Sequence, residues 1–182
     1  GDAAALRRLV ADAAAVVNCA GAVRGASRRD FDPVNADGPR QLVQALRAVT
    51  PAARLVHLSS LAARAPTLSD YAASKAAGES ALAQAAADAI DWVVLRPPAV
   101  YGPGDREIRP LFRAMSRGVL PTVAPPGARL SLLYVDDLAS AVLALLGTGA
   151  AHGRVLALDD GCSGGYDWPA IARAGEAAFA RR

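Results

Sequence analysis

Tyr71 and Lys75 are the residues of this chain whose types and spacing could carry out proton chemistry. Lys75 is the single lysine among 20 lysine and arginine residues, and it follows Tyr71 by four positions. Residues four apart on a helix lie on the same face, so the phenol and the ammonium can reach into one cleft. A phenol normally keeps its proton up to about pH 10, and a neighbouring ammonium stabilises the phenolate. The pair could therefore act as a general acid or base near neutral pH.

A pair of serines, Ser59 and Ser60, could orient a substrate oxygen. The pair follows an apolar run at residues 55–58, which is typical of a buried strand. Side chains at the carboxyl ends of parallel strands face the ligand crevice of an open sheet. We favour Ser60 as the donor. Ser59 stays open as the alternative.

Each of these groups also has a purely structural explanation. A tyrosine and a lysine four apart are often surface neighbours on a helix, and two serines after a strand often form a turn or a helix cap. Farther along the chain, the acidic pair Asp136 and Asp137 is well explained as the N-terminal cap of a helix. The functional interpretation therefore depends on the order in which all of the motifs occur along the chain.

Apolar runs of strand length alternate with helical patterns through the whole chain. Strands are expected at residues 15–18, 55–58, 92–95, 130–134 and 154–158. Helices are expected at residues 6–10, 33–49, 71–87, 108–117 and 136–146 and from 168 onward, with Pro33 at the start of the second. This alternation predicts an α/β fold in which helices cover both faces of a parallel sheet. The helix at 71–87 would then carry Tyr71 and Lys75.

Composition excludes several classes of protein. A hydrophobic fraction of 53% over 182 residues is enough for one globular domain with a core, so disorder is not expected. The net charge of +3 comes from scattered arginines, which argues against nucleic acid as a partner. Two distant cysteines without a histidine cluster indicate neither a disulfide framework nor a metal site. No apolar run reaches membrane-spanning length, and we expect a cytoplasmic protein.

Three longer motifs surround the Tyr71 and Lys75 pair. Residues 96–105 read Arg-Pro-Pro-Ala-Val-Tyr-Gly-Pro-Gly-Asp, residues 134–139 read Tyr-Val-Asp-Asp-Leu-Ala, and residues 18–21 read Asn-Cys-Ala-Gly. Together with the serine pair, they resemble the short-chain dehydrogenase/reductase superfamily. The resemblance is to its extended or atypical branch of NAD(P)-dependent epimerases, dehydratases and 3β-hydroxysteroid-dehydrogenase-like proteins.

The resemblance implies an oxidoreductase or an epimerase/dehydratase that moves hydride between a nicotinamide and a hydroxyl or carbonyl carbon of a small molecule. It implies catalytic roles for Ser60, Tyr71 and Lys75, with Asn35 supporting a water relay. It also implies NAD or NADP as cofactor. The cofactor contacts would be Asp2, Asn18, Ala20, Gly21, Ser59, Tyr71, Lys75, Arg96, Pro97, Pro98 and Val100. The alternatives are a non-catalytic cofactor-binding scaffold or redox sensor, or an inactive fragment.

The glycine-rich turn that holds the cofactor pyrophosphate in the family has no counterpart here. The glycines of residues 161–165 have the wrong spacing and are expected to form a turn. Gly1-Asp2 resembles instead the family's Gly-Asp after its third strand. We therefore expect residues 1–182 to form a single partial Rossmann-like domain, a doubly wound parallel sheet from strand four onward. The N-terminal βαβ units would be missing.

The same expectation has physical consequences. In the strand order 3-2-1-4-5-6, the strand at residues 15–18 would form an open edge. The 182 residues alone should then be poorly soluble and bind nicotinamide cofactor weakly. Part of a substrate-binding region would lie at about residues 97–134 and 160–182.

Features of the expected substrate loops favour an apolar substrate over a nucleotide sugar. Leu61, Ala62, Ala63, Pro98 and Val100 are small or apolar, which favours a substrate with an apolar body. Gly-Pro at residues 38–39 replaces the Gly-Thr common in sugar-nucleotide epimerases. The alanine-rich helix at 71–87 would also allow close packing against a symmetric partner, which leaves a homodimer open.

Overall fold

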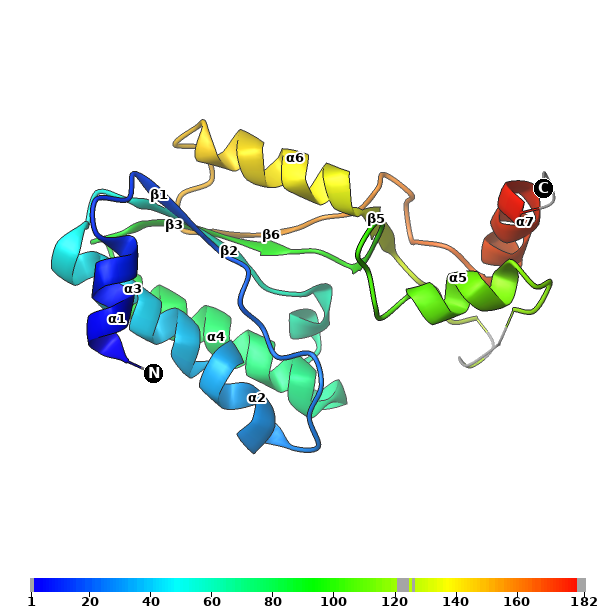
Figure 1. Ribbon diagram of the computed structural model, residues 1–182, viewed down its shortest axis with the longest axis horizontal. Coiled ribbons are helices and arrows are strands. Elements are labelled where there is room, and N and C mark those ends of the chain that lie inside the picture. Colours follow the sequence, from blue (N-terminus) through cyan, green and yellow to red (C-terminus); the bar gives the residue numbers. More distant parts are fainter. Residues whose placement is uncertain (1, 121–124, 126, 180–182) are drawn as a thin grey trace. The chain divides into compact units, whose positions relative to one another are not determined.

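The computed structural model describes residues 2–120, 125 and 127–179 (Figure 1). The chain forms two compact units. The first, here called the sheet unit, comprises Gly1–Pro97 and Ser140–Leu158, and the second, the small unit, comprises Pro98–Ala139 and Asp159–Arg182. The small unit overlaps the stretches expected to bind substrate, and substrate binding there stays a prediction.

The sheet unit contains four parallel strands in the order β1-β2-β3-β6. Their bounds are β1 Ala15–Asn18, β2 Arg54–Leu58, β3 Asp91–Arg96 and β6 Arg154–Ala157. The parallel α/β fold predicted from the sequence is confirmed, and β1 lies at an edge of the sheet as expected. The poor solubility and weak nicotinamide binding expected from that edge stay predictions. Because the strands are parallel, Asn18, Ser59 and Arg96 lie at the same end of the sheet.

Helices cover both faces of this sheet (Figure 1). One face carries α1 (Ala3–Val10), α2 (Arg28–Asn35), α3 (Asp37–Val49) and α4 (Asp70–Ala86), and residues 140–146 of α6 (Val135–Leu146) lie over the other. Two short 3-10 helices, η1 (Leu61–Arg64) and η2 (Pro66–Leu68), connect β2 to α4.

The core lies between the sheet and the helices α3 and α4. Val43 and Leu46 are three residues apart on α3, so both side chains face the same way, and both are fully buried. They pack in one cluster with Leu82 of α4, Leu55 of β2 and Val94 of β3. This packing holds α4, the helix that carries Tyr71 and Lys75, against β2 and β3.

The predicted helix start at Pro33 is wrong. The helix α2 begins at Arg28, and Pro33 lies inside it. The Asp30 carboxylate accepts hydrogen bonds from the backbone N–H groups of Ala26 and Ser27 at 2.7 and 3.0 Å, which stabilises this earlier start. Pro33 has no N–H to donate, and α2 ends two residues later, before α3 begins at Asp37.

The small unit contains a second, two-stranded parallel sheet. It pairs β4 (Ala99–Tyr101), a segment expected as a loop, with β5 (Leu132–Tyr134), which is shorter than predicted. The helix α5 (Arg109–Met115) is also shorter than predicted, whereas α6 begins one residue earlier than expected, at Val135. The remaining helix is α7 (Trp168–Phe179). The turn expected at residues 161–165 is present and is closed by a 2.9 Å bond from Gly165 N to the Cys162 carbonyl.

Candidate active site

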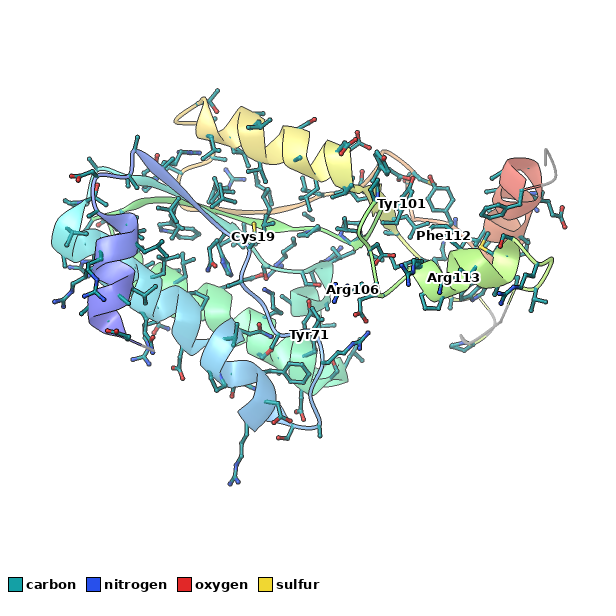
Figure 2. The ribbon with its side chains drawn as sticks, viewed as in Figure 1. Cys19, Tyr71, Tyr101, Arg106, Phe112 and Arg113 are labelled. Atoms are coloured by element: carbon teal, nitrogen blue, oxygen red, sulfur yellow. The ribbon has the colours of Figure 1, made fainter. Side chains whose placement is uncertain are left out.

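Tyr71 and Lys75 lie on the first two turns of α4. The helix begins after Ser69, whose hydroxyl oxygen accepts a 3.1 Å hydrogen bond from Ala72 N and so caps the first turn. Tyr71 packs edge-on against Phe31 of α2, with ring centroids 5.8 Å apart. Figure 2 shows Tyr71 at the end of α4 that lies next to α2. The aromatic contact holds the Tyr71 ring, and its hydroxyl is the part of the side chain left for chemistry.

The Lys75 ammonium is buried, with 3% of the residue exposed. Its Nζ donates a 2.9 Å hydrogen bond to the carbonyl oxygen of Leu58 at the end of β2. Gly21 lies close by, since a Cβ placed there would be 3.7 Å from Nζ. Burial lowers the pKa of Lys75, and the Glu79 carboxylate opposes part of that shift.

Asn35 holds the chain after β1 against α4. Its Nδ2 donates to the Ala22 carbonyl and to Ser74 Oγ, both at 2.9 Å, and its Oδ1 accepts from Ala22 N at 2.8 Å. The backbone of Asn35 also touches α4, because a Cβ added at Gly78 would come within 1.9 Å of the Asn35 carbonyl oxygen. The amide of Asn35 thus positions the loop that contains Gly21, and its part in a water relay stays a prediction.

The two serines have different surroundings. Ser59 is buried, and its hydroxyl donates to Glu79 Oε1. Ser60 is half-buried, and its Oγ accepts a 3.2 Å bond from Ala62 N as the cap of η1. Accepting that bond leaves the Ser60 proton available to a ligand, whereas the Ser59 proton is engaged by Glu79.

The sequence analysis missed Glu79, which joins α4 to the ends of β2 and β3. Besides accepting from Ser59, its carboxylate accepts from Arg96 Nε at 2.9 Å and from Arg96 Nη2 at 2.5 Å. The Glu79 side chain is 7% exposed and that of Arg96 24%, and the hydrogen bonds to Glu79 raise the pKa of Arg96. A signal did exist, because Glu79 follows Lys75 by four positions in a helix that is otherwise mostly alanine.

His57 was also missed, and it lies on β2 opposite Asn18, the last residue of β1. It is fully buried, and its Nδ1 lies 3.0 Å from Asn18 Nδ2. Burial and, secondly, the charge of Lys75 lower the pKa of His57 from 6.5 to about 3. The ring is therefore neutral at pH 7, and because the Asn18 amide can only donate from Nδ2, the ring proton sits on Nε2. Asn18 Oδ1 in turn accepts from Ala20 N at 3.1 Å, so His57 helps to fix the chain after β1.

Not every expected cofactor contact joins this cluster. Asp2 caps α1 by accepting from Ala4 N and Ala5 N at 2.9 and 3.1 Å. It also lines, with Asn18 and Ala20, a cavity of about 820 Å³ along α1, β1 and α3. The Pro97 carbonyl accepts a 2.8 Å bond from Leu61 N. Pro98 and Val100 belong to the small unit.

Among the residues that the structure describes, no cluster of three or more histidine, cysteine or acidic side chains could hold a metal ion. No described helix is long and apolar enough to cross a membrane. Cys19, exposed after β1 (Figure 2), and Cys162 in the small unit are both free thiols.

Residues 1–158 match the NAD dependent epimerase/dehydratase family. The chain belongs to this family. The match covers the whole sheet unit, with Tyr71, Lys75, Glu79 and Arg96, and ends before α7. The family assignment therefore agrees with the resemblance that the sequence motifs indicate.

Three known proteins are similar to this epimerase/dehydratase chain in sequence or in structure. It is 38% identical over 169 residues to a ceramide reductase from Caulobacter vibrioides, which covers 93% of this chain and 51% of that protein. The structure resembles a UDP-glucuronic acid 4-epimerase from Bacillus cereus in complex with NAD (TM-score 0.72, 22% identity, 87% of this chain and 58% of the other). It also resembles a double mutant of DesIV, a dTDP-glucose 4,6-dehydratase from Streptomyces venezuelae with NAD bound (TM-score 0.74, 19% identity, 100% and 62%). The chain spans about half the length of the ceramide reductase.

Proposed function

We propose that this chain serves an NAD(P)-dependent oxidoreductase reaction, in which hydride moves between the nicotinamide and a carbinol or carbonyl carbon of the substrate. The observation that carries the proposal is the buried Lys75 ammonium. It lies one helical turn after Tyr71, is held by the Leu58 carbonyl and lies beside Gly21. Membership of the NAD dependent epimerase/dehydratase family supports the same reaction class.

The donors at this point of the sheet fit a nicotinamide nucleotide. An ammonium has three N–H groups, and the structure describes one acceptor for that of Lys75, the Leu58 carbonyl. The other two N–H groups are suited to the hydroxyls of a ribose. Gly21, which has no side chain, lies beside Nζ. When bound, NAD or NADP would supply or accept the hydride.

The proton of the substrate hydroxyl would be exchanged by Tyr71. In the oxidation direction, the Tyr71 phenolate takes this proton while the carbon loses hydride, and in reduction the phenol returns it. The Lys75 ammonium stabilises the phenolate because opposite charges attract strongly in a buried site. Ser60 holds the substrate oxygen, since its proton is available and that of Ser59 is donated to Glu79.

The proposed substrate has an apolar body attached to the reacting carbon. The similarity to a ceramide reductase supports this choice. The small unit contains a cavity of about 260 Å³. Apolar and aromatic side chains dominate its lining, which includes Tyr101, Phe112, Met115, Leu132 and Ile171. Such a lining suits an alkyl chain or a ring better than a charged nucleotide.

The test is a turnover screen that follows NADH and NADPH oxidation by the full-length protein, because the 182 residues alone are expected to bind the cofactor weakly. We expect turnover with ketones that carry a long alkyl chain or an acylated amine, and little with UDP-sugars or dTDP-sugars. Turnover restricted to nucleotide sugars would overturn the substrate class, and no turnover with any class would count against the reaction.

A pair of serine variants tests the assignment of the substrate-oxygen donor. Loss of one such donor typically lowers kcat by about 100-fold or more. Ser60→Ala should therefore lower kcat by about this factor, and Ser59→Ala should lower kcat less. The reverse order would transfer the role to Ser59.

A further inference from the structure

Glu79 connects three elements at the end of the sheet where the proposed reaction takes place. Its carboxylate accepts hydrogen bonds from Ser59 after β2 and from Arg96 at the end of β3. Glu79 itself lies on α4, one turn beyond Lys75, with 6% of the residue exposed. A buried carboxylate is costly unless it is paired and hydrogen-bonded, and here all of its partners are near the reacting groups.

We propose that Glu79 is a positioning residue, whose buried carboxylate, one turn beyond Lys75 on α4, favours the ammonium form of Lys75 and, through Arg96, fixes the chain as it leaves β3. The link to catalysis rests on the proposed function. The effect on Lys75 does not, because it is a property of the chain without any ligand.

The charges around Lys75 make Glu79 the group that favours its ammonium. On α4, Tyr71 lies one turn before Lys75 and Glu79 one turn after it. From β2, His57 faces it as a neutral ring, and from the end of β3, Arg96 is paired with Glu79. The loop after β1 and α2 contribute Gly21 and the uncharged Asn35 amide. Burial disfavours the ammonium, and Glu79 acts in the opposite direction.

Arg96 also ties Glu79 to the segment that follows β3. The backbone carbonyl of Arg96 accepts from Leu158 N at 3.1 Å, and the next carbonyl, that of Pro97, accepts from Leu61 N at 2.8 Å. Ser59 N donates to the Leu95 carbonyl at 2.7 Å. One carboxylate thereby holds the exits of β2 and β3 in fixed relation to α4. The Arg96 guanidinium, expected from the sequence as a cofactor contact, has this intramolecular partner.

The single lysine of the chain allows a direct test. In protein labelled with 13C at lysine Cε, the Lys75 side-chain NMR signal is assigned by its loss in Lys75→Arg, and its shift against pH reports the protonation of Lys75. In Glu79→Gln, which keeps the size and an acceptor oxygen, the titration midpoint should move to lower pH. In Ser59→Ala, which removes a bond to Glu79 but no charge, it should stay where it is in the unaltered protein. An unchanged midpoint in Glu79→Gln, or the same shift in both variants, would overturn the proposal.

A second variant, Arg96→Gln, keeps the proposal testable if Glu79→Gln does not fold. Arg96→Gln removes a cation and leaves the Glu79 charge without its main partner, so the Lys75 midpoint should move to higher pH. A merely structural ion pair does not predict shifts of opposite sign in the two variants. A shift to lower pH in folded Arg96→Gln would contradict the proposal.

The rate profile then connects Glu79 to the proposed reaction. With cofactor and substrate, kcat of Glu79→Gln should fall at a lower pH on the alkaline side than kcat of the unaltered protein, with KM little changed. If the NMR midpoints shift as expected but no variant or parent protein turns over, the proposed function fails and the role of Glu79 in charging Lys75 stands. If turnover is present and the alkaline fall of kcat does not move, the role of Glu79 in the reaction is overturned.

Discussion

The sheet unit and the small unit differ in how they hold their polar side chains. In the sheet unit, His57, Asn35, Lys75 and Glu79 are each no more than 6% exposed, and each has a described partner from another element. In the small unit, the corresponding polar pair is Tyr166 with Asp160, an exposed hydroxyl-to-carboxylate bond. Its buried residues are few, among them Leu133 and Ile171.

This difference in the burial of polar side chains has an electrostatic consequence. The polar groups of the sheet unit are buried, and low exposure strengthens the electrostatic interactions between them. A region with fewer buried contacts tolerates substitution more readily, so we expect the small unit to be the more tolerant of the two. Matched substitutions in the two units test this difference.

The largest contrast should come from two helical glycines. In Gly78→Ala, the new Cβ would come within 1.9 Å of the Asn35 carbonyl oxygen, which is backbone and cannot turn away. We expect a loss of about 3 kcal/mol in the free energy of unfolding, as for severe overpacking. In Gly175→Ala, the Cβ would come within 2.3 Å of the terminal methyl of Met115, which is flexible. The change there should stay within about 1 kcal/mol, since alanine also favours the helix.

Urea denaturation of both glycine variants measures this contrast. Equal losses of unfolding free energy in the two variants would show that both units resist an added methyl group to the same extent. A neutral Gly78→Ala would mean that α2 and α4 do not approach each other as closely as the structure shows.

The next prediction concerns pH and His57, the buried histidine of the sheet unit. Because the pKa of His57 is about 3 in the folded chain and 6.5 as its ordinary value, the unfolded chain binds the proton more readily. The contribution to stability is complete above pH 6.5 and is lost as pH falls toward 3. At pH 4.5, two units below 6.5, this group alone should lower the free energy of unfolding by roughly 2 to 3 kcal/mol relative to pH 7.

Denaturation curves at pH 7 and pH 4.5 test the role of His57. His57→Gln should reduce the difference between the two pH values by most of that amount. A difference that persists in His57→Gln would assign the acid sensitivity to other groups.

The smallest contrast compares two hydroxyl-to-carboxylate bonds. Ser59→Ala removes a donor from the buried Glu79 carboxylate and should lower the free energy of unfolding by about 1 to 3 kcal/mol. Tyr166→Phe removes the equivalent bond to the exposed Asp160, where water can replace the hydroxyl, and should change it by less than about 0.5 kcal/mol. A larger effect in Tyr166→Phe would indicate that the small unit depends on that bond.

Local sequence signals predicted the main strands and the position of the Tyr71 and Lys75 pair. The strands at residues 15–18 and 92–95 could be predicted because short apolar runs between polar turns leave little alternative. The strand β4 was not expected because three residues after two prolines carry almost no periodic signal, and its pairing with β5 joins segments about thirty positions apart. The early start of α2 depended on the Ser27 and Asp30 cap, which outweighed the proline inside the helix.

The candidate site was only partly visible in the sequence. The four-residue spacing of Tyr71 and Lys75 is a local feature of one helix and can be read directly. The partners of Glu79 lie 20 and 17 positions away on other elements, so the bond network appears only when the sheet is assembled. For the same reason, the sequence could not decide between Ser59 and Ser60, whose hydroxyls differ in what the fold places next to them.

The most direct test of the proton-exchanging pair is turnover and cofactor binding by the Tyr71→Phe variant of the full-length protein. This change removes one hydroxyl and keeps the ring against Phe31. We expect kcat to fall by about 100-fold or more, while the dissociation constant of NADH, measured by fluorescence, stays near that of the unaltered protein. Tyr134→Phe, a matched change in the small unit, should keep its turnover. Turnover of Tyr71→Phe within a few-fold of the unaltered protein would contradict the claim that Tyr71 and Lys75 form the proton-exchanging pair.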